Sequence, residues 1–151
     1  MRPSTSTTCV TITGTYNTTT KALNFTTTSP AFTFTGTYNN GKVEGTFTGG
    51  GGSGVFVVHS GTVQVFCGAY TGDSDGIWNL VKTGNTLDGV YYDVSGTTGR
   101  LTGSVSGSTI TITFPGGTAA GTLSGNSMTG TWQTLTSDAG TWAGQTGGCR
   151  G

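Results

Sequence analysis

Hydrophobic and polar residues alternate strictly along several short segments of this chain. In residues 10–16, 32–38 and 109–114, an apolar residue or glycine alternates with threonine. Because successive side chains of a β-strand point to opposite faces, a period of two predicts half-buried strands. Threonine suits such strands, since its β-branched side chain packs well on a pleated surface. Helices are not expected, because glycine recurs too often for a helical run to survive.

A second pattern reinforces the first: glycine, one residue, then an aromatic residue, in nine places. On a strand the glycine and the ring share a face, so that a ring can lie over bare backbone. The nine pairs are Gly14/Tyr16, Gly36/Tyr38, Gly45/Phe47, Gly54/Phe56, Gly68/Tyr70, Gly76/Trp78, Gly89/Tyr91, Gly130/Trp132 and Gly140/Trp142.

Turn signals separate the alternating segments at intervals near ten residues, which predicts tight hairpins. They are Asn39-Asn40-Gly41, Thr83-Gly84-Asn85, Ser106-Gly107-Ser108 and Ser124-Gly125-Asn126. We therefore expect an all-β fold, an antiparallel up-and-down meander of about a dozen short strands. A closed β-barrel buries one face and removes the edges, so we favour it over a two-sheet sandwich. The irregular intervals disfavour a parallel solenoid.

The length of 151 residues predicts a single domain over residues 1–151. The glycine run at residues 49–54 resembles a linker, but similar strands flank it, so we interpret it as a flexible loop inside the domain. Residues 54–59 and 62–67 are predicted to pair as a hairpin that is apolar on both faces. Such a hairpin is either covered by another segment, for example the N-terminal arm, or used for self-association.

Charge excludes several partners. Six basic residues balance six acidic ones, and charged residues make up only 8% of the chain. There is no basic field for nucleic acid and no polybasic segment for a membrane surface, and no stretch is long and apolar enough for a membrane helix. Low net charge favours self-association into a homo-oligomer or polymer. The threonine-rich, charge-poor surface favours export, so we expect an extracellular protein.

The three cysteines, Cys9, Cys67 and Cys149, match no zinc spacing, and His59 is the only histidine. They are candidates for one disulfide in any of three pairings, with Cys9–Cys149 a natural staple between the ends. The third thiol is then either buried or available to a second molecule. We expect no metal site and no cofactor.

Candidate catalytic groups are few. His59-Ser60 is the only adjacent pair of base and nucleophile, and neighbours on a strand point apart. Asp88 and Asp93 are five residues apart, which places them on opposite faces of a strand. Asp73-Ser74-Asp75-Gly76 begins like a calcium loop but lacks the remaining ligands, so we interpret it as a turn. A site assembled from distant strands stays open, yet we favour a non-catalytic protein.

The aromatic residues are the best candidates for ligand contacts. Rings on the inner face of a small barrel either pack solidly or line a cavity, and tryptophan and tyrosine suit an apolar molecule or a sugar ring. The candidate ligand-binding residues are Trp78, Tyr91, Trp132, Trp142 and Tyr38.

Two segments, Ile12-Thr13-Gly14-Thr15-Tyr16-Asn17 and Phe34-Thr35-Gly36-Thr37-Tyr38, resemble the opening strands of avidin-like and lipocalin-like up-and-down barrels. Of the ligand residues of the avidin family, only Tyr38 lies in a matching motif, because Asn17 follows Tyr16 directly and points to the other face. The resemblance therefore does not imply biotin binding. The stretch from Cys67 to Trp142 is similar to Gly/Thr-rich barrel segments of secreted bacterial proteins, which implies a barrel and export.

Three functions remain as hypotheses. The first is an exported, non-catalytic binding module with an aromatic-lined barrel or groove for a small apolar ligand or glycan. The second is a structural subunit of an extracellular filament, sheath or surface layer. The third is ice binding through outward threonines such as Thr109, Thr111 and Thr113, for which sheet twist spoils the flat array required.

Overall fold

The computed structural model describes residues 11–147, which contain thirteen antiparallel strands and no helix. The prediction of an all-β antiparallel meander is confirmed, as is the closed barrel. The chain forms two compact units, with the boundary between Gly61 and Thr62. One unit is an open five-stranded sheet and the other a closed eight-stranded barrel. The single domain expected from the chain length stays a prediction.

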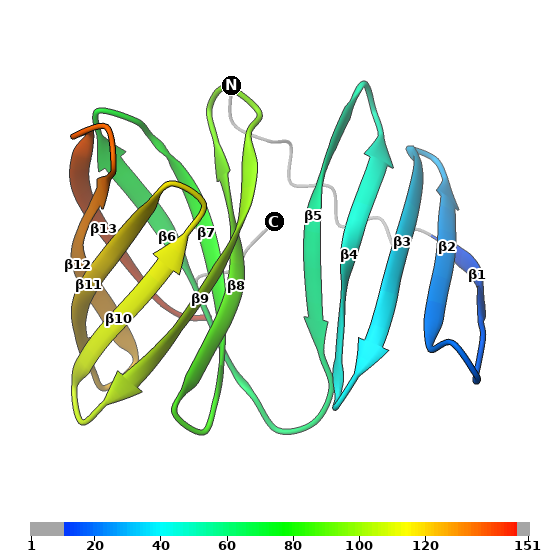
Figure 1. The fold of residues 1–151 in the computed structure, drawn as a ribbon, viewed down its shortest axis with the longest axis horizontal. Coiled ribbons are helices and arrows are strands. Elements are labelled where there is room, and N and C mark those ends of the chain that lie inside the picture. Colours follow the sequence, from blue (N-terminus) through cyan, green and yellow to red (C-terminus); the bar gives the residue numbers. More distant parts are fainter. Residues whose placement is uncertain (1–10, 148–151) are drawn as a thin grey trace. The chain divides into compact units, whose positions relative to one another are not determined.

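The first unit is a meander in which each strand pairs with the next (Figure 1, blue to cyan). Its strands are β1 (Ile12–Tyr16), β2 (Ala22–Thr28), β3 (Ala31–Asn39), β4 (Lys42–Gly49) and β5 (Gly52–His59). The register puts threonine opposite threonine on one face, as in Thr26↔Thr33↔Thr48, and aromatic opposite aromatic on the other, as in Phe25↔Phe34↔Phe47. Alternation in the sequence therefore becomes one hydroxylated and one aromatic face.

The second unit closes on itself, because its last strand pairs with its first (Figure 1, green to red). Its strands are β6 (Gln64–Gly72), β7 (Gly76–Thr83), β8 (Thr86–Asp93), β9 (Thr98–Ser106), β10 (Thr109–Phe114), β11 (Gly117–Ser124), β12 (Ser127–Thr134) and β13 (Ala139–Thr146). The closing ladder runs from Gly72↔Gly140 to Phe66↔Thr146. Closure leaves no strand of this unit with an unpaired edge.

The predicted turns connect strands as expected. Two residues separate the strands at Asn40-Gly41, Gly84-Asn85, Gly107-Ser108 and Gly125-Asn126. Asn40 and Gly41 have φ values of 48° and 79°, the left-handed backbone that a tight hairpin needs and that asparagine and glycine tolerate best.

The predicted hairpin of residues 54–59 and 62–67 is wrong. The two segments belong to different units: β5 pairs with β4, whereas β6 pairs with β7 and β13. The glycine run, interpreted from the sequence as a loop inside the domain, connects two strands of the first unit, and Gly50 and Gly51 alone separate β4 from β5. The two avidin-like segments lie on β1 and β3, which places both in the open sheet and not in the barrel.

The barrel is packed solidly at one end. The largest fully buried side chains are Phe66, Leu80, Leu87, Ile110 and Met128. Most of them lie near the β7–β8, β9–β10 and β11–β12 turns, so side chains from several strands fill that end. All twelve buried hydrophobic residues of the described chain belong to the barrel. The fully buried side chains gather at this end, so any cavity inside the barrel is expected at the opposite end.

Several glycines of the barrel strands, some of them in the Gly-x-aromatic pairs, leave room for a ring from a neighbouring strand. A Cβ added at Gly144 would come within 2.5 Å of Trp78, and one added at Gly140 within 2.6 Å of Trp132. A Cβ added at Gly130 would come within 2.7 Å of Trp142, and one added at Gly121 within 2.5 Å, so Trp142 lies over both glycines. Gly130 and Gly140 thus each precede a tryptophan and also leave bare backbone on which another indole rests, which helps three indoles to fit inside eight strands.

Candidate functional site

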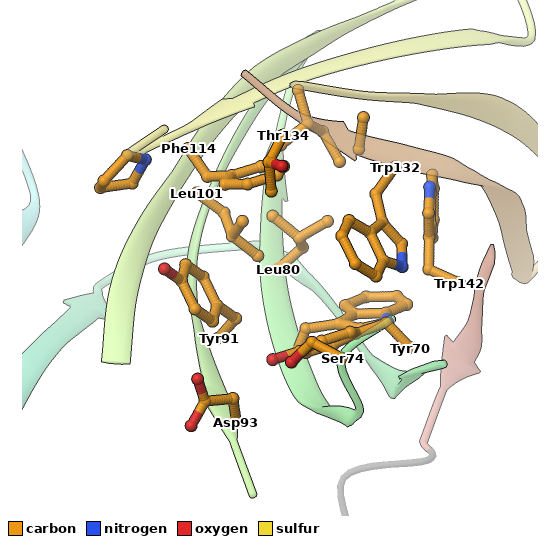
Figure 2. Close-up of a pocket in the computed structure, with 14 residues that line it drawn as sticks. Tyr70, Ser74, Leu80, Tyr91, Asp93, Leu101, Phe114, Trp132, Thr134 and Trp142 are labelled. Atoms are coloured by element: carbon orange, nitrogen blue, oxygen red, sulfur yellow. The ribbon is translucent and has the colours of Figure 1, made fainter. Parts of the chain in front are cut away.

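The open end of the barrel contains a cavity of about 200 Å³. All eight strands of the barrel contribute to its lining, and Figure 2 shows the rings grouped around the space. The lining residues are Tyr70, Ser74, Trp78, Leu80, Tyr91, Asp93, Leu101, Ile112, Phe114, Pro115, Ala119, Trp132, Thr134 and Trp142. Most of these side chains are apolar, and most of the polar ones lie near the β6–β7, β8–β9 and β12–β13 turns.

Four of the five candidate ligand-binding residues line this cavity: Trp78, Tyr91, Trp132 and Trp142. They come from β7, β8, β12 and β13, so closure of the barrel brings together residues far apart in the sequence. Tyr38 lies instead on β3 of the open sheet, where its ring meets Tyr16 edge to face at 6.4 Å. It is not among the lining residues, and a role of the other four in binding stays a prediction.

Edge-to-face contacts fix the rings of the cavity. Tyr70 meets Trp132 at 5.9 Å and Tyr91 at 6.2 Å, and Tyr91 in turn meets Phe114 at 6.0 Å. Trp78 meets Trp142 at 5.5 Å, nearly at a right angle. Such pairs are worth about 0.5–1.5 kcal/mol beyond the area they bury, so the wall is held in a defined shape.

The indole N–H groups donate to the protein backbone. Trp78 Nε1 donates to the Ala69 carbonyl at 3.2 Å, Trp132 Nε1 to Thr71 at 3.2 Å, and Trp142 Nε1 to Thr131 at 3.1 Å. Each of these donors is therefore satisfied within the barrel wall. The tryptophans present ring carbons to the cavity, and its polar side chains are those of Tyr70, Ser74, Tyr91, Asp93 and Thr134. Sequence reasoning could not find this arrangement, because it depends on the rotation of each ring.

The two cavity tyrosines ionise less readily than free tyrosine. Burial raises the pKa of Tyr70 to about 12, the negative charge of Asp93 adds to the rise, and a hydrogen bond with Ser74 opposes it. Burial and the charge of Asp93 also raise the pKa of Tyr91. Both phenols are therefore neutral hydroxyl groups at ordinary pH, able to donate as well as accept.

The candidate catalytic groups do not meet. Asp88 points outward from β8 and pairs with Arg100 of β9, whereas Asp93 lines the cavity, as their spacing predicts. His59 ends β5 of the open sheet, and the Ser60 hydroxyl donates to the Gly41 carbonyl at 3.1 Å. Asp73, Ser74 and Asp75 form the β6–β7 turn, in which Asp75 Oδ1 accepts from the Gly72 N–H at 3.2 Å.

Among residues 11–147, no group of three or more His, Cys, Asp or Glu side chains could hold a metal ion. The same residues contain no helix long and apolar enough to cross a membrane. Cys67 lies on β6 opposite Gln145, whereas Cys9 and Cys149 lie outside the described residues. The pairing of the cysteines therefore stays a prediction.

The outward threonines proposed for ice binding lie on β10 of the barrel wall. Thr113 and Thr102 hydroxyls lie 3.1 Å apart, and Thr111 and Ser104 hydroxyls 3.3 Å apart. The hydroxyls thus bond to one another across strands of a curved wall, which differs from the flat array that ice requires.

Comparison with known proteins gives no family for this chain. It matches no protein-family model and no curated protein.

Proposed function

We propose that the protein is an exported, non-catalytic binding module whose barrel takes up a small apolar molecule. The observation that carries the proposal is the cavity at the open end of the barrel, about 200 Å³ in volume and lined by six aromatic and two leucine side chains among others. Concave, mostly apolar pockets with a few polar groups at defined places are the usual form of small-molecule sites.

The volume limits the size of the ligand. An engineered apolar cavity of about 150 Å³ binds benzene, so a cavity of about 200 Å³ matches one ring with a short substituent. Long lipids and oligosaccharides exceed this space unless most of the molecule stays outside the barrel.

The chemistry of the wall favours an apolar ligand over a glycan. A sugar ring needs several hydrogen-bond partners along its edge, but the three indole N–H groups already donate to backbone carbonyls. The hydroxyls of Tyr70 and Tyr91 can serve one polar substituent at the opening, whereas the Thr134 hydroxyl is already bonded to Asp138. The remaining side chains of the cavity wall expose only ring carbons and aliphatic groups to a ligand.

The indole N–H resonances provide a direct test. All three tryptophans of the chain line the cavity, so a two-dimensional ¹⁵N spectrum contains three reporters of its occupancy. Titration with tert-butylbenzene is expected to shift all three saturably, whereas methyl glucoside is expected to leave them in place. The proposal fails if no one-ring compound, neutral or cationic, shifts them up to its solubility limit, and a saturable response to the glucoside alone would favour a glycan site.

A second candidate function, a structural subunit that polymerises, draws on the open sheet. Five phenylalanines from β2, β3, β4 and β5 form one aromatic face, in which Phe34 stacks on Phe25 at 4.5 Å and meets Phe56 at 5.6 Å. None of the five is fully buried, and Phe32 and Phe47 complete the group. Within residues 11–147, β1 has one neighbouring strand. An apolar face beside a strand edge, in a chain without net charge, suits association with a second copy.

Sedimentation velocity over a wide concentration range tests this candidate. We expect the mass of the wild type to rise with concentration, and Phe34→Lys to reduce the rise because it places a charge in the centre of the aromatic face. Thr35→Lys, at the next residue of β3 and on the opposite face, is the matched control and should behave like the wild type. A wild-type protein that stays monomeric at millimolar concentration would contradict the candidate.

A further inference from the structure

The cavity has one charged side chain in its lining, the carboxylate of Asp93. Asp93 is the last residue of β8, two positions after Tyr91, so both side chains are on the inner face of the barrel. Figure 2 shows Asp93 beyond Tyr91, on the side of the cavity where Ser74 and Tyr70 lie. A ligand held among the rings can therefore place one end at this carboxylate.

Local hydrogen bonds keep Asp93 ionised. Its Oδ1 accepts from the Ser95 N–H at 2.8 Å, the Ser95 hydroxyl at 2.6 Å and the Thr97 N–H at 2.8 Å. Burial disfavours the charge, but the bonds from Ser95 and Thr97 outweigh it and lower the pKa of Asp93. All three of these bonds fall on the same carboxylate oxygen. They hold the β8–β9 turn, while the side chain as a whole lines the cavity.

Charge is distributed unevenly along the chain, although the total is zero. Residues 62–147 contain five acidic residues against two basic ones. Four of the five, Asp73, Asp75, Asp93 and Asp138, lie at or beside the turns of the open end. The two basic residues lie elsewhere: Lys82 is near the β7–β8 turn at the packed end, and Arg100 pairs with Asp88 outside the barrel. The opening is therefore electronegative.

The rings next to Asp93 are of the kind that attracts cations. The charge of Asp93 acts on both Tyr70 and Tyr91, and Tyr70 meets Tyr91 and Trp132 edge to face. The faces of such rings carry negative electrostatic potential, so an ammonium group gains there about 0.5–2 kcal/mol, more when it is desolvated. An anionic ligand finds no positive side chain in the lining.

We propose that the ligand is a small organic cation, an aryl or alkyl ammonium compound, with its apolar body among the tryptophans and its charged nitrogen between Asp93 and the rings of Tyr70 and Tyr91. This inference rests on the proposed function and adds the charge of the ligand. The apolar part supplies burial, and the carboxylate selects a cation over a neutral or negative molecule of the same shape.

Two isosteric probes separate this inference from the proposed function. Phenyltrimethylammonium and tert-butylbenzene have the same shape and differ by one nitrogen and its charge. The indole N–H shifts give the dissociation constant of each. We expect the cation to bind the wild type about tenfold more tightly or better, since an ion pair with a partly buried carboxylate adds to the cation–π attraction.

The Asp93→Asn variant tests the residue itself. Asparagine retains an acceptor oxygen for the Ser95 and Thr97 N–H groups, so the turn should persist while the charge is lost. We expect the affinity for the cation to fall about tenfold and the affinity for tert-butylbenzene to stay within about twofold. Asp138→Asn is the matched control, because Asp138 lies at the same end, bonded to Thr136 and Thr134, but outside the cavity lining. It should change neither affinity by more than about twofold.

Each outcome has one meaning. If both probes bind equally to the wild type, the inference is overturned and the proposed function stands. If neither probe binds, the proposed function fails and the inference fails with it. If Asp138→Asn weakens cation binding as much as Asp93→Asn does, the general field of the open end selects the ligand and the role of Asp93 is overturned. The comparison of the two probes on the wild type needs no variant, so it decides the charge preference even if Asp93→Asn does not fold.

Discussion

Replacing Trp142 by alanine is expected to lower the free energy of unfolding of the barrel by about 3–5 kcal/mol, the usual cost of removing a large buried aromatic side chain. The ring is 6% exposed, meets Trp78 at 5.5 Å and lies over the bare backbone of Gly130 and Gly121. These neighbours cannot move in to fill the space, because the glycines have no side chains and the closed ladder fixes the strands. The loss should therefore lie in the upper part of the range.

Urea unfolding followed by tryptophan fluorescence measures this effect, because Trp78 and Trp132 remain and both lie in the barrel. Leu135→Ala is the control: its side chain is 88% exposed, so the change should be within about 0.5 kcal/mol. A loss below about 1 kcal/mol for Trp142→Ala would contradict the packing described above, because a ring that contributes so little cannot be part of the core.

Filling the cavity from within is expected to abolish ligand binding. Ala119 lies on the inner face of β11, opposite Trp132 and Ile112, and lines the cavity. The larger side chain of Ala119→Phe should occupy the space in which the ligand ring lies. We expect the affinity for tert-butylbenzene to fall by about 100-fold, equivalent to about 2.7 kcal/mol. Because the new ring enters existing space, the cost to stability should be small compared with overpacking a solid core.

The next residue of the same strand gives the matched control. Ala120 is exposed on the outer face, so Ala120→Phe adds the same ring outside the barrel and should leave the affinity within about twofold of the wild type. The same indole N–H titration measures both variants. Unchanged affinity in Ala119→Phe would show that the ligand binds elsewhere, and the cavity would lose its role in the proposed function.

The sequence predicts most of this fold because its signals are local. Alternation and tight turns such as Asn40-Gly41 specify strands and hairpins without reference to the rest of the chain. Reliance on local signals also explains why the predicted pairing of residues 54–59 with 62–67 is wrong. Two apolar runs separated by a few residues look like a hairpin, and nothing local reveals that β6 takes β13 as its partner instead. Such a distant partner is chosen by packing of the whole barrel.

The site was predictable in part. The Gly-x-aromatic motif places Trp78, Trp132 and Trp142 on an inner face, but the same motif places Tyr38 on the open sheet. The motif identifies a face and not the sheet to which that face belongs. In the sequence, Asp93 stands out only as a candidate acid or base, because an aspartate before a turn is ordinary in any β protein. Its place beside the rings emerges only when the barrel closes.

Closure of the barrel also orders the events of folding. Every strand pair but one joins neighbours in the chain, whereas the final ladder joins residues as distant as Phe66 and Thr146. Hairpins form early because their loops are short, and the ladder of high sequence separation forms late and slowly. During synthesis on a ribosome, β6 can pair with β7 early, but its other edge stays unpaired until β13 has been synthesised. During that interval both β6 and the growing end expose unpaired backbone, so the last strand governs how long the nascent chain is vulnerable to association with its neighbours.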